Sequence, residues 1–274
     1  YDTAAEIRLH QAQVRFLGNL MRWNPPRPAE GQPAPELGAV EKGRFLSLVA
    51  EPARVTIDVS HAGRGRPVPS GMGQSIPGML TMFVVMSVLI GGSAELTKER
   101  DLGTLRRLAT TTLSKTEVFG GKLAGLLLMG LAQAFILVVV SEMLGRFGLA
   151  NVNFSWVGHL PGLIPLLLAF CFCIASLGIF LSGLFKTTQQ AESLAWLVGM
   201  VLAGLGGCWW PLEIVPATMQ TVGHLFPTAW AMDGLHALIT FGDGFAGVVT
   251  PVLVLMAFGT VFALLGTRTM RITD

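Results

Sequence analysis

Long apolar stretches without a single charged side chain dominate the sequence after residue 66. A helix needs roughly 20 apolar residues to cross about 30 Å of hydrocarbon at a rise of about 1.5 Å per residue. Five stretches without Asp, Glu, Lys or Arg come close to or exceed that length: 67–94, 123–141, 147–185, 193–212 and 244–267. The pattern predicts an all-α polytopic membrane protein whose five spans lie at about 77–95, 122–143, 160–184, 193–211 and 246–267.

The first 73 residues have a different composition. Residues 1–70 contain 9 of the 19 basic residues and 7 of the 17 acidic residues. Sparse apolar positions predict a helix over 1–22, five prolines predict an extended linker at 24–38, and the alternation of ARVTIDVS predicts a strand at 53–60. We therefore expect two domains: a small α/β domain over 1–73 outside the bilayer, and a transmembrane domain over 74–274.

The basic residues of the connecting loops predict the orientation. Alternate loops hold nine Lys or Arg residues against one, Arg146. By the positive-inside rule, 95–122, 185–192 and the C-terminal tail are cytoplasmic, so 1–73 is extracytoplasmic. Such a domain needs a segment to carry it across, which predicts one more span ahead of Tyr1 and six in the full chain. We expect an integral protein of a bacterial inner membrane.

The composition excludes a soluble enzyme, a disordered chain, a nucleic-acid binder and a disulfide scaffold. The three cysteines, Cys171, Cys173 and Cys208, show no pairing or metal-ligand spacing. In the outer segment 211–230, Pro216 and Pro227 bracket a predicted short helix. Histidines and carboxylates share this outer region, but their spacing fits no zinc motif, and we predict no metal site. They are His224, His236, Glu213 and Asp233.

The loop 95–122 is the most informative stretch of the chain. Gly103 is a break after the first span, and Thr104–Ala109 predicts a short amphipathic helix. Ser114 with Glu117 three residues later is typical of a capping box that begins the next helix. On the residues alone, two interpretations stay open: a surface on which another protein docks, or a basic loop on the membrane surface.

A family resemblance bears on this choice. The pattern E-R-D-x-G-T-L-x-x-L-x-T-x-x-L-S-x-x-E-x-x-x-G-K, which begins at Glu99, resembles the intracellular loop of ABC exporter permeases of the ABC-2 type. The resemblance runs from about 74 to 267 and extends to three further stretches: Gln74–Gly78, Pro211–Pro216 and Leu225–Trp230. Thr112 stands where the family usually has proline, and the family's first span is absent.

The resemblance implies the permease subunit of an exporter that works by alternating access. ATP and Mg would bind a separate cytoplasmic ATP-binding cassette ATPase, and a second permease copy or homologue would complete the pathway. This chain has no phosphate-binding loop, because Thr116 stands where the first glycine should be. We therefore expect no catalytic site and no cofactor. The implied ATPase-coupling residues are Glu99, Arg100, Gly103, Thr104, Leu105, Leu108, Glu117, Gly121 and Lys122.

Two polar residues within the spans are candidates for a substrate path. Gln133 lies in mid-span, and Glu142 lies near the outer end of the same helix. Both have simpler interpretations: Gln133 bonds a neighbouring helix, and Glu142 reaches water or Arg146. Two other function classes stay open, a carrier driven by an ion gradient and an intramembrane enzyme that uses Cys171 or Cys173. The substrate is unidentified, and the apolar spans favour an amphiphilic or hydrophobic one.

Overall fold

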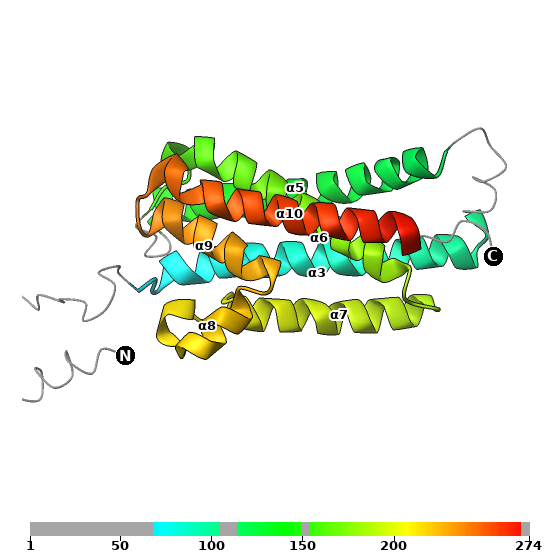
Figure 1. Cartoon of the computed structure of the whole chain (residues 1–274). Coiled ribbons are helices and arrows are strands. Elements are labelled where there is room, and N and C mark those ends of the chain that lie inside the picture. Colours follow the sequence, from blue (N-terminus) through cyan, green and yellow to red (C-terminus); the bar gives the residue numbers. More distant parts are fainter. Residues whose placement is uncertain (1–67, 105–113, 149–153, 270–274) are drawn as a thin grey trace, which may run out of the picture. The chain divides into compact units, whose positions relative to one another are not determined.

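The computed structural model describes residues 68–104, 114–148 and 154–269. All regular structure in these ranges is helical (Figure 1). Two single turns of 3-10 helix, Val157–His159 and Leu212–Ile214, accompany the α-helices. The α-helices are α3 (Met72–Asp101), α5 (Lys115–Arg146), α6 (Leu160–Ser182), α7 (Thr188–Leu205), α8 (Ala217–Gly223), α9 (Pro227–Ile239) and α10 (Gly244–Thr269).

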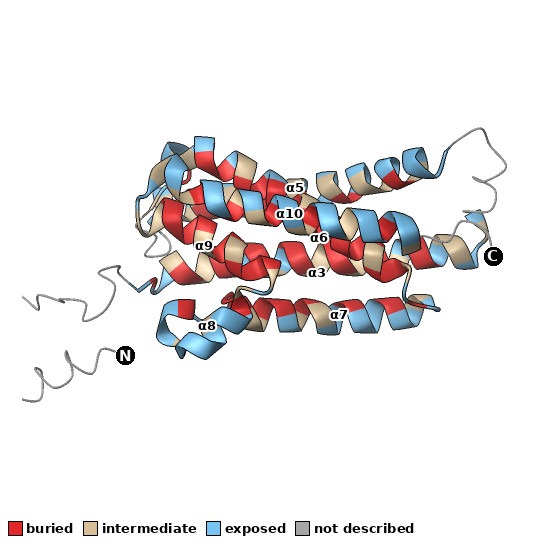
Figure 2. Ribbon diagram, in the orientation of Figure 1, coloured by how far each residue is buried: buried red, intermediate tan, exposed pale blue. Residues whose placement is uncertain are grey.

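The five longer helices run side by side, with α6 in the middle (Figure 1). Of the apolar stretch long enough to cross a membrane, 72% is buried in the segment that contains α6, against 22% in both α5 and α10. α6 packs against α10, α3 and α5, while α7 packs against α3. Exposed residues follow the outer helices (Figure 2), and many of them are large and apolar, such as Leu128, Phe135 and Leu253. Apolar side chains that face outward are what a bilayer requires of a helix bundle.

One end of the bundle is basic. The end of α3, the start of α5, the turn between α6 and α7 and the end of α10 lie there (Figure 1). We call it the basic end and the opposite one the far end. Of the described Lys and Arg residues, Arg146 alone lies at the far end. The others belong to the basic end: Lys98, Arg100, Lys115, Lys122, Lys186 and Arg268.

Four described helices are long and apolar enough to cross a membrane, against the five predicted: α3, α5, α10 and the stretch Val157–Ser182 that contains α6. The predicted span at 193–211 falls on α7, which has 18 residues and begins with the polar run Thr188-Gln189-Gln190. The count of five spans is therefore not supported. The predicted α/β domain lies outside the described residues, apart from residues 68–73, and the described part of the chain contains no strand.

Small residues explain why α7 lies so close to α3. Ala191, Ala195, Gly199 and Ala203 recur every four residues and are buried. A Cβ added to Gly199 would lie 2.9 Å from the sulfur of Met86 on α3. Because four residues make about one helical turn, these positions form one face, and their small size lets the two backbones approach closely.

At the far end, the beginning of α3 packs against the turn after α7. Gln74 Nε2 donates a hydrogen bond of 2.8 Å to the Gly207 carbonyl. A Cβ on Gly78 would lie 2.0 Å from the Cys208 carbonyl oxygen, so only glycine fits there. The predicted short helix after Pro216 is α8. The following helix, α9, was not predicted, and most of its residues are buried against α10, α3 and α6.

Candidate coupling site at the basic end

Three consecutive residues at the end of α3 bind three other elements. Glu99, Arg100 and Asp101 occupy the last turn of the helix, directly before the break at Gly103. Successive side chains on an α-helix point about 100° apart, because one turn contains about 3.6 residues. The three side chains therefore leave the helix in three directions, and each one meets a different neighbour.

Glu99 forms an ion pair with Lys122 of α5, in which Nζ of the lysine contacts Oε1 of the glutamate. The two side chains are only 26% and 29% exposed. Partial burial makes such a pair stronger than a fully solvated one, whose usual value is about 0–1 kcal/mol. The pair thus ties the end of α3 to the beginning of α5.

Arg100 points to the turn that joins α6 to α7. Its Nη2 donates hydrogen bonds of 2.6 Å to the Phe185 carbonyl and 3.2 Å to the Lys186 carbonyl. These carbonyls lie three and four residues after Ser182, the last residue of α6, within the turn that leads to α7. The neighbouring Asp101 accepts a hydrogen bond of 3.2 Å from the hydroxyl of Thr188, the first residue of α7.

The break after α3 and the start of α5 follow the sequence. Gly103 has a φ of 69°, in the left-handed region that favours glycine. Ser114 caps α5: its backbone N–H donates 2.7 Å to Glu117 Oε2, and the Glu117 N–H donates 3.3 Å to the serine hydroxyl. This reciprocal pair is the expected capping box. Gly121 has open space where a Cβ would stand, so packing within this chain does not require glycine there.

The structure thus joins Glu99 to Lys122 but does not bring all the predicted coupling residues together. Arg100 bonds this chain's own α6–α7 turn, and its coupling to an ATPase stays a prediction. Thr104 ends the described part of α3's loop, and Leu105 and Leu108 lie outside the described residues, as does most of the predicted helix Thr104–Ala109. Sequence reasoning missed the partners of Arg100 and Asp101. The partners of Arg100 are the backbone carbonyls of Phe185 and Lys186, and a backbone carbonyl leaves no signal in a sequence. The partner of Asp101 is the hydroxyl of Thr188.

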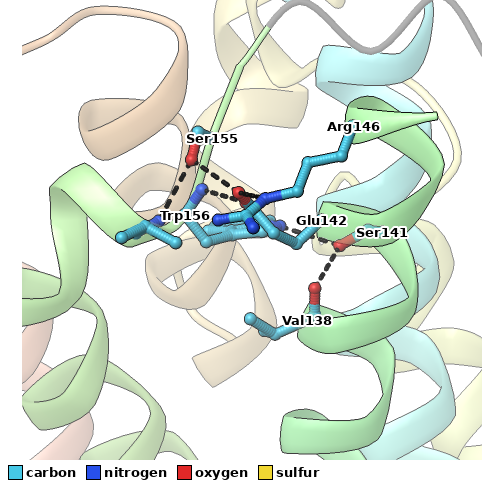
Figure 3. A network of polar contacts seen from close by, with 7 residues as sticks. Val138, Ser141, Glu142, Arg146, Ser155 and Trp156 are labelled. Atoms are coloured by element: carbon cyan, nitrogen blue, oxygen red, sulfur yellow. Dashed lines mark hydrogen bonds and ion pairs between the residues drawn. The ribbon is translucent and has the colours of Figure 1, made fainter. Parts of the chain in front are cut away.

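Glu142 belongs to a polar network at the far end of α5 (Figure 3). Its carboxylate accepts 2.8 Å from the Ser155 hydroxyl and 2.9 Å from the Trp156 backbone N–H, and Arg146 lies 3.5 Å away. The Trp156 indole N–H donates 2.8 Å to Ser141. The network fastens the segment before α6 to the end of α5. This position agrees with the simpler interpretation of Glu142, in which its carboxylate reaches Arg146. Gln133 lies earlier in α5 and is half-buried.

A second polar cluster holds α8 against α9. His224 Nδ1 lies 2.7 Å from the Gln220 carbonyl, and Nε2 lies 2.8 Å from Asp233 Oδ2. Both partners are acceptors, so both ring nitrogens donate only when the imidazole is protonated. The bond to Asp233 raises the pKa of His224 to about 9, against partial burial. No three metal-ligating side chains gather into a site among residues 68–104, 114–148 and 154–269.

Comparison with known protein families identifies the family of this chain. Residues 49–268, most of the chain, match the family model of the ABC-2 family transporter proteins. The chain belongs to this family. It is therefore an integral membrane protein and an ABC transporter permease subunit.

Curated relatives agree with this membership. The linearmycin resistance permease protein LnrN of Bacillus subtilis is 25% identical over 191 residues, which cover 70% of this chain and 48% of the relative. The probable multidrug ABC transporter permease YbhR of Escherichia coli is 24% identical over 152 residues, 56% of this chain and 39% of the relative. The chain spans about half the length of such relatives.

Proposed function

We propose that this chain is the transmembrane subunit of an ATP-driven exporter, and that loop 95–122 receives the movement of a separate ATPase. The observation that carries the proposal is the family match over 49–268, together with the three ties that fix the end of α3. In this proposal ATP and Mg bind the partner subunit. Closure of the partner displaces the loop, and the helices rearrange so that the pathway opens to the other side.

Six basic residues at one end of the bundle support a cytoplasmic position for that end, in a bacterial inner membrane. Residues 1–73 would then lie outside. We propose α7 as a fifth span, since 18 residues extend about 27 Å at about 1.5 Å each, close to the roughly 30 Å of the hydrocarbon core. A span ahead of Tyr1 and a second permease copy or homologue would complete the transporter.

We propose an amphiphilic or hydrophobic substrate on the apolar character of the spans, and two relatives' names connect those relatives with resistance or with drugs. One carries linearmycin resistance in its name, and another is named as a probable multidrug permease. The described spans are apolar, and large apolar side chains line their exposed faces. No observation favours the two other classes. Glu142 is engaged by Ser155 and Trp156, and Cys171 and Cys173 are buried.

Purification of the complete, tagged protein from its own membranes tests the proposal. We expect a stoichiometric ATPase to copurify, with activity that vanadate inhibits. Leu105→Asp should remove the ATPase, and Gly103→Pro should weaken it, because proline requires a φ near −65° where the chain has 69°. Phe147→Ala, at the exposed end of α5 on the far side of the bundle, is the matched control. Failure of any ATPase to copurify, under several detergents, would refute the proposal.

A further inference from the structure

The three polar contacts at the end of α3 connect it to different parts of the bundle. Glu99 connects it to α5, Asp101 to the start of α7, and Arg100 to the carbonyls between α6 and α7. A displacement of this one helical turn therefore reaches three elements at once. Of the three residues, Arg100 alone bonds the backbone, so the identity of the side chains in the α6–α7 turn does not matter for its contact.

The turn that Arg100 binds is itself firmly attached. Gly183, at the end of α6, packs so tightly on Thr269 of α10 that a Cβ would lie 2.7 Å from the threonine Cβ. Thr187 caps α7 by accepting 3.3 Å from the Gln190 N–H. Phe185 is buried. Because the turn is joined to three helices, a force applied to its carbonyls moves those helices rather than the turn alone.

We propose that Arg100 is a positioning residue that passes the movement of loop 95–122 to the α6–α7 turn, and through it to α7. The inference rests on the proposed function, since the movement originates in the ATPase. It also gives Arg100 a role within this chain, because its guanidinium bonds this chain's own backbone. A charged donor that holds two carbonyls resists displacement better than a neutral contact does.

Substitutions of Arg100 and of the neighbouring Lys98 distinguish this role from an effect of positive charge alone. Arg100→Met removes both hydrogen bonds but keeps an apolar stem. Arg100→Lys keeps the charge, but the lysine side chain is shorter and its ammonium replaces the rigid, planar guanidinium whose Nη2 meets both carbonyls, so the contact should be weakened. Lys98→Met is the matched control, because Lys98 is an exposed cation two residues away on the same turn. All three variants leave the Glu99–Lys122 pair in place.

Spin labels report the movement directly. Leu184→Cys in the turn and Phe135→Cys on α5, which is not one of the three helices joined by the turn, are both exposed, at 55% and 68%, and the three native cysteines are buried. The distance between the labels is measured by pulsed electron paramagnetic resonance on the complete complex, first without nucleotide and then with Mg-ATP and vanadate. In the parent protein and in Lys98→Met we expect the distance distribution to shift on trapping.

In Arg100→Met, the ATPase should still copurify, while the ratio of molecules with the shifted distance to molecules with the unshifted distance falls by at least about tenfold, the change in equilibrium constant that corresponds to loss of a charge-assisted hydrogen bond. Arg100→Lys should lie between the two. A full shift in Arg100→Met with bound ATPase would overturn the role of Arg100 and leave the proposed function standing. Absence of an ATPase from every version, the parent included, would overturn the proposed function and this inference with it.

Discussion

Protonation of His224 should determine the stability of the far end across a defined pH range. The imidazole donates to the Gln220 carbonyl and to Asp233, and Glu213 adds a further negative charge nearby. Trp230 contacts the ring edge-on, with centroids 5.2 Å apart. Its indole N–H donates 2.8 Å to the His224 carbonyl. His236 also lies near Asp233, but it carries no charge in this pH range, because burial lowers its pKa to about 4.

The sign follows from the direction of the pKa shift. A group whose pKa is raised on folding stabilises the folded state fully below its unfolded pKa, 6.5, and loses that contribution as the pH rises through about 9. A full shift of this size corresponds to roughly 3 kcal/mol. Solvent screens the pair, since the His224 and Asp233 side chains are 32% and 38% exposed, so we expect about 1–2 kcal/mol.

The assay is thermal unfolding in detergent, followed by tryptophan fluorescence, for the parent protein and for His224→Gln. At pH 6.5 the variant should melt about 3–6 °C lower, on the scale of about 2–4 °C per kcal/mol for a domain of this size. The gap should close as the pH approaches 10. His159→Gln, a half-buried histidine at the same end, is the control. A gap that stays constant between pH 6.5 and 10 would show that His224 is not held in the charged form.

Three further predictions concern packing and polar contacts. Gly78→Ala should destabilise the protein by at least about 2 kcal/mol, because the new Cβ meets the Cys208 carbonyl, whereas Gly125→Ala, in open space, should be nearly neutral; equal melting temperatures would contradict this. A double-mutant cycle of Glu99→Gln and Lys122→Met should give a coupling of about 1 kcal/mol in denaturation, and additivity would argue against the pair. Glu142→Ala should cost about 1–3 kcal/mol in thermal unfolding, because the Trp156 N–H loses its acceptor; an unchanged melting temperature would disprove that contact's role.

The sequence predicted those features that depend on local pattern. Charge-free runs marked α3, α5, α6 and α10, because a helix surrounded by lipid needs apolar residues along its whole length. Ser114 and Glu117 predicted the start of α5, since a capping box is complete within four residues. The clustering of basic residues at one end of the bundle also followed from the alternating loops.

Features that depend on contacts between distant segments were missed. The hydrogen bonds of Arg100 were not predicted, because its acceptors are backbone carbonyls 85 and 86 residues away. The helix α9 begins at Pro227, which was predicted only to end the short helix before it, although proline is common at the first position of a helix. The need for glycine at Gly78 comes from a backbone carbonyl after α7, more than a hundred residues later.

The lengths of α3 and α5 have a consequence for whatever binds at the basic end. The two helices contain 30 and 32 residues, which at about 1.5 Å each makes them roughly 45–48 Å long. The hydrocarbon core is only about 30 Å thick. All charged residues of α3 lie in its last turns, and three of the five in α5 lie near its start (Lys115, Glu117 and Lys122), so we expect most of the surplus to project at the basic end. A partner that binds this projection meets it in water, and its affinity will respond to salt concentration far more than to the lipid composition of the membrane.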